Sequence, residues 1–246
     1  MSATILAVVA HPDDESLIAG GTLALAARAG AEVAIVSLTR GELGPIADSA
    51  LATRETLAAV REQELAAAGR ILGATFTACL RLPDGELPWT DRDRAAGELT
   101  ALLDGRLPEV ILTFGEDGLY WHGDHIAAAE IAHRTASELG GIEVLEAVWL
   151  RATAPTLAAA AREHGLPDSL WGIEPEAFGS DREPVLSVDI TPVLALKLEA
   201  LRAHRSQLAA GNLLAELPLK LAEDHLAYEH WAGPSAAKLK AILGDG

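Results

Sequence analysis

Two short runs in the sequence hold most of the side chains that could do chemistry. One run is AHPDDE at residues 10–15, and the other is YWHGDH at residues 120–125. Several ionisable groups in one tight turn repel each other unless a cation balances their charge. Histidine nitrogens and carboxylate oxygens are both zinc ligands, and a catalytic zinc site keeps three protein ligands and one open position. The two runs therefore predict a catalytic metal centre.

Five ionisable residues of the two runs have a place in such a centre. His11, Asp14 and His125 would supply the three ligands. Asp13 would then be free to take a proton from a water molecule activated by the metal, and His122 would support the developing oxyanion or protonate the leaving amine. A plainer alternative is that Asp13 and Asp14 only cap a helix and His11 is a buried core residue, which neither run excludes by itself.

The pattern of apolar residues predicts the elements that must position these two runs. Short runs of branched apolar residues indicate buried strands, at residues 5–10, 33–38, 76–82, 110–114, 144–150 and 185–190. Helical spacing and capping residues predict helices, at residues 16–27, 54–72, 91–103 and 125–139, and from Thr191 onward. Residues 151–184 are less regular and are expected to form an insertion or cap.

Short apolar strands that alternate with helices predict the fold class. This pattern is typical of a Rossmann-like α/β fold, in which a mostly parallel sheet has helices on both faces. We expect one domain over residues 1–246, with a small cap region at about 151–184. Ligands of such folds bind where the strand order reverses, between the first and fourth strands of a Rossmann-like order. The two reactive runs follow these two strands, so we expect them to meet.

Composition and charge exclude some classes of partner. The 246 residues carry a formal net charge of −17, which repels phosphate backbones and anionic lipids, so neither nucleic acid nor a membrane is an expected partner. Cys79 is the only cysteine, so no internal disulfide can form, which is compatible with the expected cytoplasmic location. The first residues hold no basic region and no long apolar segment, and we expect no signal peptide. A homo-oligomer stays open.

The motifs in these runs resemble those of the PIG-L/LmbE-like deacetylase family. The run HPDDE at residues 11–15, followed by GGTLA at 20–24, carries the resemblance together with HGDH at 122–125. Weaker similarities are TRGELG at 39–44, REQE at 61–64 ahead of Leu72-Gly73, and Lys197, Ala200, His204, Ser206 and Gln207 near the C-terminus. The likeness covers most of the chain.

The resemblance implies an activity and a metal. The activity is metal-dependent hydrolysis of the N-acetyl amide of an N-acetylglucosaminyl compound, which releases acetate and a free amino sugar. The partner would be a small N-acetylated sugar, such as a precursor of a sugar-based low-molecular-weight thiol. The cofactor would be zinc, held by His11, Asp14 and His125, with Asp13 as the general base.

The resemblance also implies roles for the second run. His122 would be the general acid or an electrostatic partner, and Asp124 would orient His122 and raise its pKa. Tyr120 would help to polarise the amide carbonyl. Gly123 departs from the family, in which many members have proline, so this loop is expected to be less rigid without losing a reactive group.

Four further residues are weaker candidates. Glu42 and Arg61 are candidates for binding sugar hydroxyls, with a solvated loop charge and an ion pair on a helix face as the alternatives. Lys197 and His204 lie seven residues apart, on the same helix face as a stripe of leucines. We therefore expect both to point inward and either to support the metal centre or to tether the cap.

Three other functions stay open at this point. An amidase that acts on conjugates of a sugar thiol would use the same residues. Two histidines and one aspartate with open positions also describe a non-haem iron(II) oxygenase, and Fe²⁺ is an alternative to Zn²⁺ in the hydrolase as well. A non-catalytic binding protein would need neither Asp13 nor His122, so the presence of both favours an enzyme.

Overall fold

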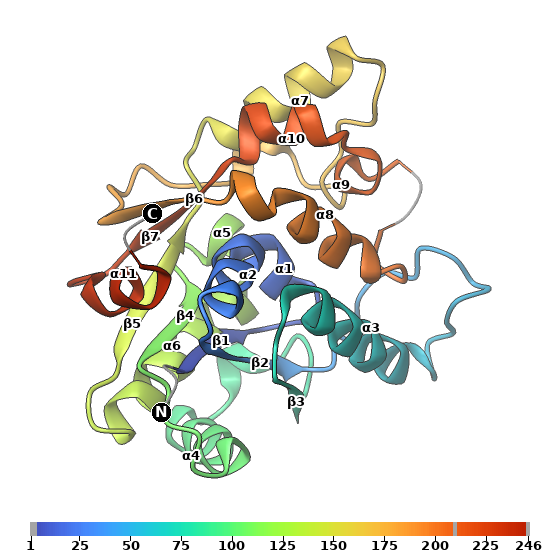
Figure 1. Ribbon diagram of the computed structural model, residues 1–246. Coiled ribbons are helices and arrows are strands. Elements are labelled where there is room, and N and C mark those ends of the chain that lie inside the picture. Colours follow the sequence, from blue (N-terminus) through green and yellow to red (C-terminus); the bar gives the residue numbers. More distant parts are fainter. Residues whose placement is uncertain (1–3, 209–210, 245–246) are drawn as a thin grey trace.

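The computed structural model, drawn in Figure 1, describes residues 4–208 and 211–244. Its centre is a seven-stranded sheet with the strand order β3-β2-β1-β4-β5-β7-β6. The first five strands pair in parallel, whereas β7 is antiparallel to both of its neighbours, β5 and β6. The strands are β1 (Thr4–Val9), β2 (Glu32–Thr39), β3 (Phe76–Leu82), β4 (Val110–Phe114), β5 (Glu143–Val148), β6 (Leu186–Asp189) and β7 (Tyr228–Ala232).

Helices cover both faces of the sheet (Figure 1). On one face α2, α3 and α8 pack against one another, and on the other α4 packs against α6. This arrangement confirms the predicted Rossmann-like α/β class. The helices are α1 (Asp14–Ile18), α2 (Gly20–Arg28), α3 (Leu57–Leu72), α4 (Arg92–Leu103), α5 (Gly118–Trp121), α6 (Gly123–Glu138), α7 (Thr153–Glu163), α8 (Leu194–Ala203), α9 (Leu213–Glu216), α10 (Leu219–Leu226) and α11 (Ala237–Leu243), with short 3-10 turns at Leu87–Trp89, Pro175–Ala177 and Thr191–Val193.

The strand β1 is the central element that leads the chain into the first reactive run. Its residues from Ile5 to Val9 are at most 1% exposed, as a strand covered on both faces requires. Where the chain leaves β1, the carbonyl oxygen of Ala10 accepts hydrogen bonds from the hydroxyls of Ser37 (3.1 Å) and Thr39 (2.9 Å) on β2. The turn that follows is therefore anchored to the neighbouring strand.

The helix predicted at residues 16–27 is in fact two helices, α1 and α2, separated at Ala19. The break frees the backbone N–H groups at the start of α2. The carboxylate of Glu229 accepts hydrogen bonds from Gly21 N (2.8 Å) and Thr22 N (2.7 Å). A side chain at Gly21 would lie 2.5 Å from Ile190, so only glycine fits there. A partner more than 200 residues away thus decides where the second helix begins.

The second half of the sheet and the cap region also differ from prediction. Residues 151–184 contain the regular helix α7, and Pro155 lies in its first turn, where the missing N–H does no harm. The strand β7 was not predicted, because Glu229 and His230 interrupt its apolar pattern. The long helix α3 begins at Leu57 rather than at Arg54.

The structure leaves two expectations about the whole chain untested, the single domain and the absence of a signal peptide. A single domain over residues 1–246 stays a prediction. Residues 1–3, part of the segment that argued against a signal peptide, lie outside the described residues. Within the described part of the chain, no helix combines the length and the apolar character that crossing a membrane requires.

Candidate active site and metal cluster

The two reactive runs meet at the carboxyl edge of the sheet. The strands β1 and β4 are neighbours, paired from Ile5↔Val110 to Ala7↔Leu112, and the strand order reverses between them. The first run forms the turn after β1 and the start of α1. The second run follows β4 and spans α5 and the start of α6. The predicted meeting point is therefore confirmed.

His11, Asp14 and His125 form a group that could hold a metal ion, and we call it the metal cluster. One ligand atom from each residue lies within 4.8 Å of the others. His11 Nδ1 lies 3.3 Å from Asp14 Oδ2, and His125 Nε2 lies 3.4 Å from Asp14 Oδ1. Two imidazoles and one carboxylate are a donor set that fits zinc or iron(II).

The surroundings of His125 prepare its ring to bind a metal. Its Nδ1 lies 3.0 Å from the carbonyl oxygen of Gly118, which can only accept, so this nitrogen carries the hydrogen. The lone pair of Nε2 is then directed towards Asp14. Burial, together with the nearby ring of His11, lowers the pKa of His125 to about 4, so the ring stays neutral as a metal ligand must be.

His11 is held from its other side by two carboxylates, Asp84 and Asp124, which we call the aspartate bracket. Nε2 of His11 lies 3.1 Å from Asp84 Oδ1 and 3.3 Å from Asp124 Oδ2. Burial disfavours the charged ring, but hydrogen bonds to Asp124, Asp14 and Asp84 outweigh it and raise the pKa of His11. This excess of negative charge is what a bound cation would balance.

The aspartate bracket is itself fixed by backbone amides. Asp124 accepts hydrogen bonds from Gly85 N (2.8 Å) and Leu87 N (3.2 Å), and Asp84 accepts one from Leu43 N (2.7 Å). The two aspartates and His11 also lie close enough to be counted as a possible metal group. Three of their four oxygens already accept backbone N–H groups, whereas Asp14 accepts one, from His11 N at 2.8 Å through Oδ2, and keeps Oδ1 free, so we assign the metal to the metal cluster.

Asp84 was missed by sequence reasoning. It lies in the Pro83-Asp84-Gly85 turn after β3, which predicts only the end of a strand. The useful signal was its position, because a carboxylate after the third strand of a parallel sheet lies at the same edge as the first run.

Asp124 has different partners from those expected. Its charge acts on the pKa of His122 in the expected upward direction, but its carboxylate makes its hydrogen bonds to His11 and the backbone. Burial and the nearby His11 lower the pKa of His122, and the attraction of the carboxylates does not reverse this. His122 Nδ1 is buried without a hydrogen-bond partner among the described residues. Its ring stacks on His125 at 4.4 Å between centroids.

Asp13 lies beside the metal cluster in an unusual backbone conformation, with φ at 132°. Its carboxylate makes no capping hydrogen bond to α1, which argues against a mere helix cap. Asp13 Oδ1 lies 3.1 Å from Arg61 Nη2. Burial raises the pKa of Asp13 to about 6, although Arg61 acts in the opposite direction. A carboxyl with this pKa can both take up and release a proton near neutral pH.

Arg61 connects the two loops that flank Asp13. Its guanidinium donates to the carbonyl oxygens of Gly41 (2.9 Å) and Pro12 (2.6 Å), and the residue is 3% exposed. A Cβ at Gly41 would lie 2.3 Å from the guanidinium, so this close approach requires glycine. Glu42, the other predicted sugar-binding residue, bonds the amide of Asp84 through Oε1 and does not line the cavity described next.

A cavity of about 380 Å³ opens over the metal cluster, within the size range of small-molecule sites. Its rim includes two residues of the predicted cap region, Trp171 and Ile173, so this region does reach the site. The other lining residues are the metal cluster itself, Asp13, Leu17, Leu43, Gly44, Pro45, Arg61, Asp84, Gly85, Tyr120, His122 and Gln207.

Tyr120 packs over the second run. Its ring centroid lies 5.3 Å from that of His125 and 5.6 Å from that of His122. The flanking residues Leu119 and Trp121 have φ values of 73° and 63°, so the backbone turns sharply on both sides of it. Burial raises the pKa of Tyr120, which keeps its hydroxyl a hydrogen-bond donor.

Comparisons with known proteins agree with this geometry. The family described as PIG-L, GlcNAc-PI de-N-acetylase, matches residues 6–136. The chain is 34% identical over 268 residues to a 1D-myo-inositol 2-acetamido-2-deoxy-alpha-D-glucopyranoside deacetylase of Nakamurella multipartita, covering 90% of this chain and 87% of that protein. The structure of N,N'-diacetylchitobiose deacetylase from Pyrococcus horikoshii matches with a TM-score of 0.63 and 25% identity, over 94% of this chain and 82% of the other.

A further solved structure shares the fold alone. It is GalB, the 4-carboxy-2-hydroxymuconate hydratase from Pseudomonas putida KT2440, with a TM-score of 0.66 and 20% identity over 94% of this chain and 96% of that one. One fold can thus host different reactions, and the site has to decide between them. The matched family and the deacetylase from Nakamurella multipartita together show that the chain belongs to the PIG-L family.

Proposed function

We propose that this protein is a zinc-dependent N-deacetylase that hydrolyses the acetamide of an N-acetylglucosaminyl compound to acetate and a free amino sugar. The observation that carries the proposal is the metal cluster together with the half-buried carboxylate of Asp13, which lies 3.1 Å from Arg61 and lines the same 380 Å³ cavity. The relatives that are named deacetylases of N-acetylated sugars support the choice of bond and of substrate class.

His11, Asp14 and His125 would hold the metal, and both nitrogens of the histidine rings are assigned. His125 uses Nδ1 to bond a carbonyl oxygen, which leaves its Nε2 for the ion. His11 uses Nε2 to contact the aspartate bracket, which leaves its Nδ1 for the ion. When bound, a zinc ion, or iron(II) as the alternative, lowers the pKa of water and polarises the amide carbonyl.

The protein's own groups carry the proton through the reaction. Asp13 accepts a proton as water attacks the carbonyl carbon, and its pKa of about 6 lets it return that proton to the amine nitrogen as the C–N bond breaks. His122 is neutral near pH 7, because its pKa is lowered, so we assign it as an N–H donor to the oxyanion rather than as the general acid. Tyr120 and His122 both line the cavity, and the Tyr120 hydroxyl would be a second donor.

Amine release tests this proposal. The zinc-loaded protein is incubated with N-acetylglucosaminyl-inositol, N-acetylglucosaminyl-malate, N-acetylated chito-oligosaccharides and free N-acetylglucosamine, and new primary amine and acetate are quantified. We expect equal amounts of the two products from at least one compound, and about 100- to 10,000-fold slower release from the zinc-loaded Asp13→Asn variant. Absence of amine from all of them at full zinc occupancy would contradict the proposal.

Two variations of this assay address the other functions. Anaerobic incubation separates hydrolysis from oxygenation by iron, because hydrolysis needs no dioxygen. Conjugates of an N-acylated sugar thiol test the amidase alternative, in which the same residues cleave a different amide.

We further propose that the whole chain acts as one domain in the cytoplasm. The first point is supported by the site itself, since Asp13 from the N-terminal part and Gln207 from the C-terminal part line one cavity. The second rests on the cysteine content, in which Cys79 is alone.

A further inference from the structure

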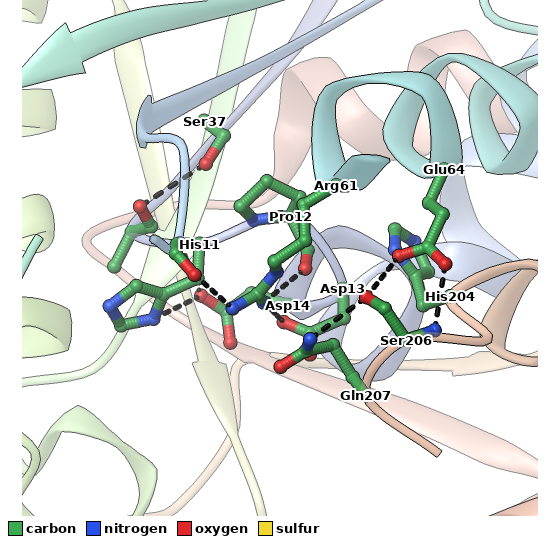
Figure 2. Close-up of polar contacts among 12 residues, drawn as sticks. His11, Pro12, Asp13, Asp14, Ser37, Arg61, Glu64, His204, Ser206 and Gln207 are labelled. Atoms are coloured by element: carbon green, nitrogen blue, oxygen red, sulfur yellow. Dashed lines mark hydrogen bonds and ion pairs between the residues drawn. The ribbon is translucent and has the colours of Figure 1, made fainter. Parts of the chain in front are cut away.

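His204 lies behind the metal cluster and has no part in the mechanism described so far. It follows the last residue of α8 and is fully buried. Its Nε2 lies 2.8 Å from Glu15 Oε1, and its Nδ1 has no hydrogen-bond partner among the described residues. Figure 2 shows His204 with Ser206 and Gln207 on the side of Asp13 away from His11. Among the described residues, the contact with Glu15 is therefore the one hydrogen bond through which the His204 ring can act on the site.

Glu15 links His204 to the backbone of Asp13. The Glu15 side chain is fully buried, and its second oxygen, Oε2, accepts the N–H of Asp13 at 3.0 Å. One carboxylate therefore joins the end of α8 to the turn that carries the proposed general base. The two contacts use different oxygens, so both are made at the same time.

The turn at Asp13 needs such support. With φ at 132°, Asp13 is in a region that residues with a side chain rarely adopt, and such a conformation persists only where its surroundings hold it. Arg61 holds the turn from one side, through Pro12 O and the Asp13 carboxylate. Glu15 holds the Asp13 N–H from the other side. The direction of the Asp13 side chain therefore depends on both contacts.

The residues that follow His204 are held by hydrogen bonds that do not involve Asp13. Glu64 on α3 accepts hydrogen bonds from the N–H (2.7 Å) and hydroxyl (2.6 Å) of Ser206, and Gln207 Nε2 donates to Pro45 O (3.0 Å), as Figure 2 shows in part. These bonds fix the segment that follows α8 to α3 and to the loop at the cavity rim. His204 is thus held on a rigid support rather than on a free chain end.

We propose that His204 is a positioning residue, which through Glu15 holds the Asp13 turn in the conformation that aims the general base at the substrate. The role of Asp13 in this statement rests on the proposed function. The effect of His204 on the turn does not, because it is a statement about the backbone of this chain.

The helix α8 offers a matched control for this proposal. Lys197 forms a second buried ion pair, with its Nζ 2.6 Å from Glu229 Oε1, and Glu229 accepts the first N–H groups of α2. One pair starts from α8 and the other from the residue directly after it, and each ends on a carboxylate that accepts backbone N–H groups. Lys197 is absent from the cavity over the metal cluster, so Lys197→Met removes a comparable interaction without touching the Asp13 turn.

The test compares His204→Leu, His204→Gln and Lys197→Met with the parent protein, all loaded with zinc. The readouts are zinc content, thermal unfolding, and kcat and KM for amine release from N-acetylglucosaminyl-inositol. We expect His204→Leu to lower kcat by about 10- to 100-fold, as a misplacement of about 1 Å does, with zinc content and KM little changed. His204→Gln keeps an N–H near the position of Nε2 and should restore most of the turnover. Lys197→Met should lower the unfolding temperature but retain kcat.

A folded, fully loaded His204→Leu protein whose kcat falls no further than that of Lys197→Met would overturn the proposal. If His204→Leu does not fold, Glu15→Met replaces it. This variant removes both acceptor oxygens, so unchanged kcat in a folded Glu15→Met protein would also overturn the proposal. Crystal structures separate this result from failure of the proposed function. The φ of Asp13 should leave the positive region in His204→Leu and stay there in Lys197→Met, whichever reaction the protein catalyses.

Discussion

Carboxylates approach the His11 ring from both sides, and the two sides differ in what else holds those carboxylates. On the Nδ1 side, Asp14 and His125 approach the ring and line the cavity. On the Nε2 side, the aspartate bracket is tied to three backbone amides. Asp14 accepts one backbone N–H, from His11 through Oδ2, and its Oδ1 stays available to an ion, whereas three of the four oxygens in the aspartate bracket accept backbone N–H groups and so hold His11 in place. Composition alone thus does not tell a metal ligand from its support.

The largest effect that this comparison predicts is loss of the metal from the Nδ1 side. His125→Ala removes a direct ligand and should lose most of its zinc and with it the activity. Elemental analysis of the purified, folded variant measures this, with circular dichroism as the check on folding. Full zinc occupancy in His125→Ala would move the metal to the aspartate bracket and reverse our assignment of the two sides.

Asp13 belongs to neither side of the ring, and Asp13→Asn should separate metal binding from catalysis. The amide cannot accept the proton of the attacking water, so turnover should fall by about 100- to 10,000-fold, the usual contribution of general acid–base catalysis. Zinc content should equal that of the parent. Near-normal kcat in this variant would remove Asp13 from the mechanism.

The aspartate bracket should have a smaller effect, exerted through His11. Asp124→Asn weakens the hold on His11 Nε2, and partners of this kind commonly contribute about 10- to 100-fold in metal affinity. Competition with a zinc chelator measures the change, and Asp84→Asn should show a similar one. If Asp124→Asn instead keeps its zinc affinity and only shifts the pH profile, then Asp124 acts on His122, as the sequence had suggested.

The smallest effect is a shift of the pH profile through Arg61. Asp13 must be ionised to accept a proton, so kcat/KM should fall as the pH decreases through its pKa, which burial raises to about 6. The Arg61 guanidinium stabilises the carboxylate and lowers this pKa. Arg61→Gln should therefore raise the pKa and move the acidic limb to higher pH, and it should also lower the plateau of kcat/KM, because the Asp13 turn loses one of its two supports. A bound cation moves the acidic limb of the parent protein and that of Arg61→Gln to lower pH, and the limb of the variant still lies at the higher pH of the two.

Arg61→Lys is the control for this shift. It keeps the charge but not the two-pronged contact with Pro12 and Gly41, so its acidic limb should stay near that of the parent while KM rises. A limb that moves equally in Arg61→Lys and Arg61→Gln would show that geometry, not charge, sets the pKa of Asp13.

Sequence and structure agree best where a motif is local. The strands at 76–82 and 110–114 were predicted at their observed bounds, and the two reactive runs were predicted to meet. Prediction failed where a distant partner decides the local structure. The carboxylate of Glu229 caps α2 and interrupts the apolar pattern of β7, so both the helix break and this strand were missed.

By itself, the sequence determined the fold class, the meeting of the two runs and the three residues able to bind a metal, because alternating apolar segments and short motifs are local properties. Only the tertiary structure decided which carboxylates support His11, that Asp124 makes its hydrogen bonds to His11 and the backbone, and that His204 reaches the Asp13 turn through Glu15. The physical reason is that these contacts join segments about 40 to 190 residues apart. The spacing of residues along the chain does not predict which buried oxygen accepts a hydrogen bond from which donor.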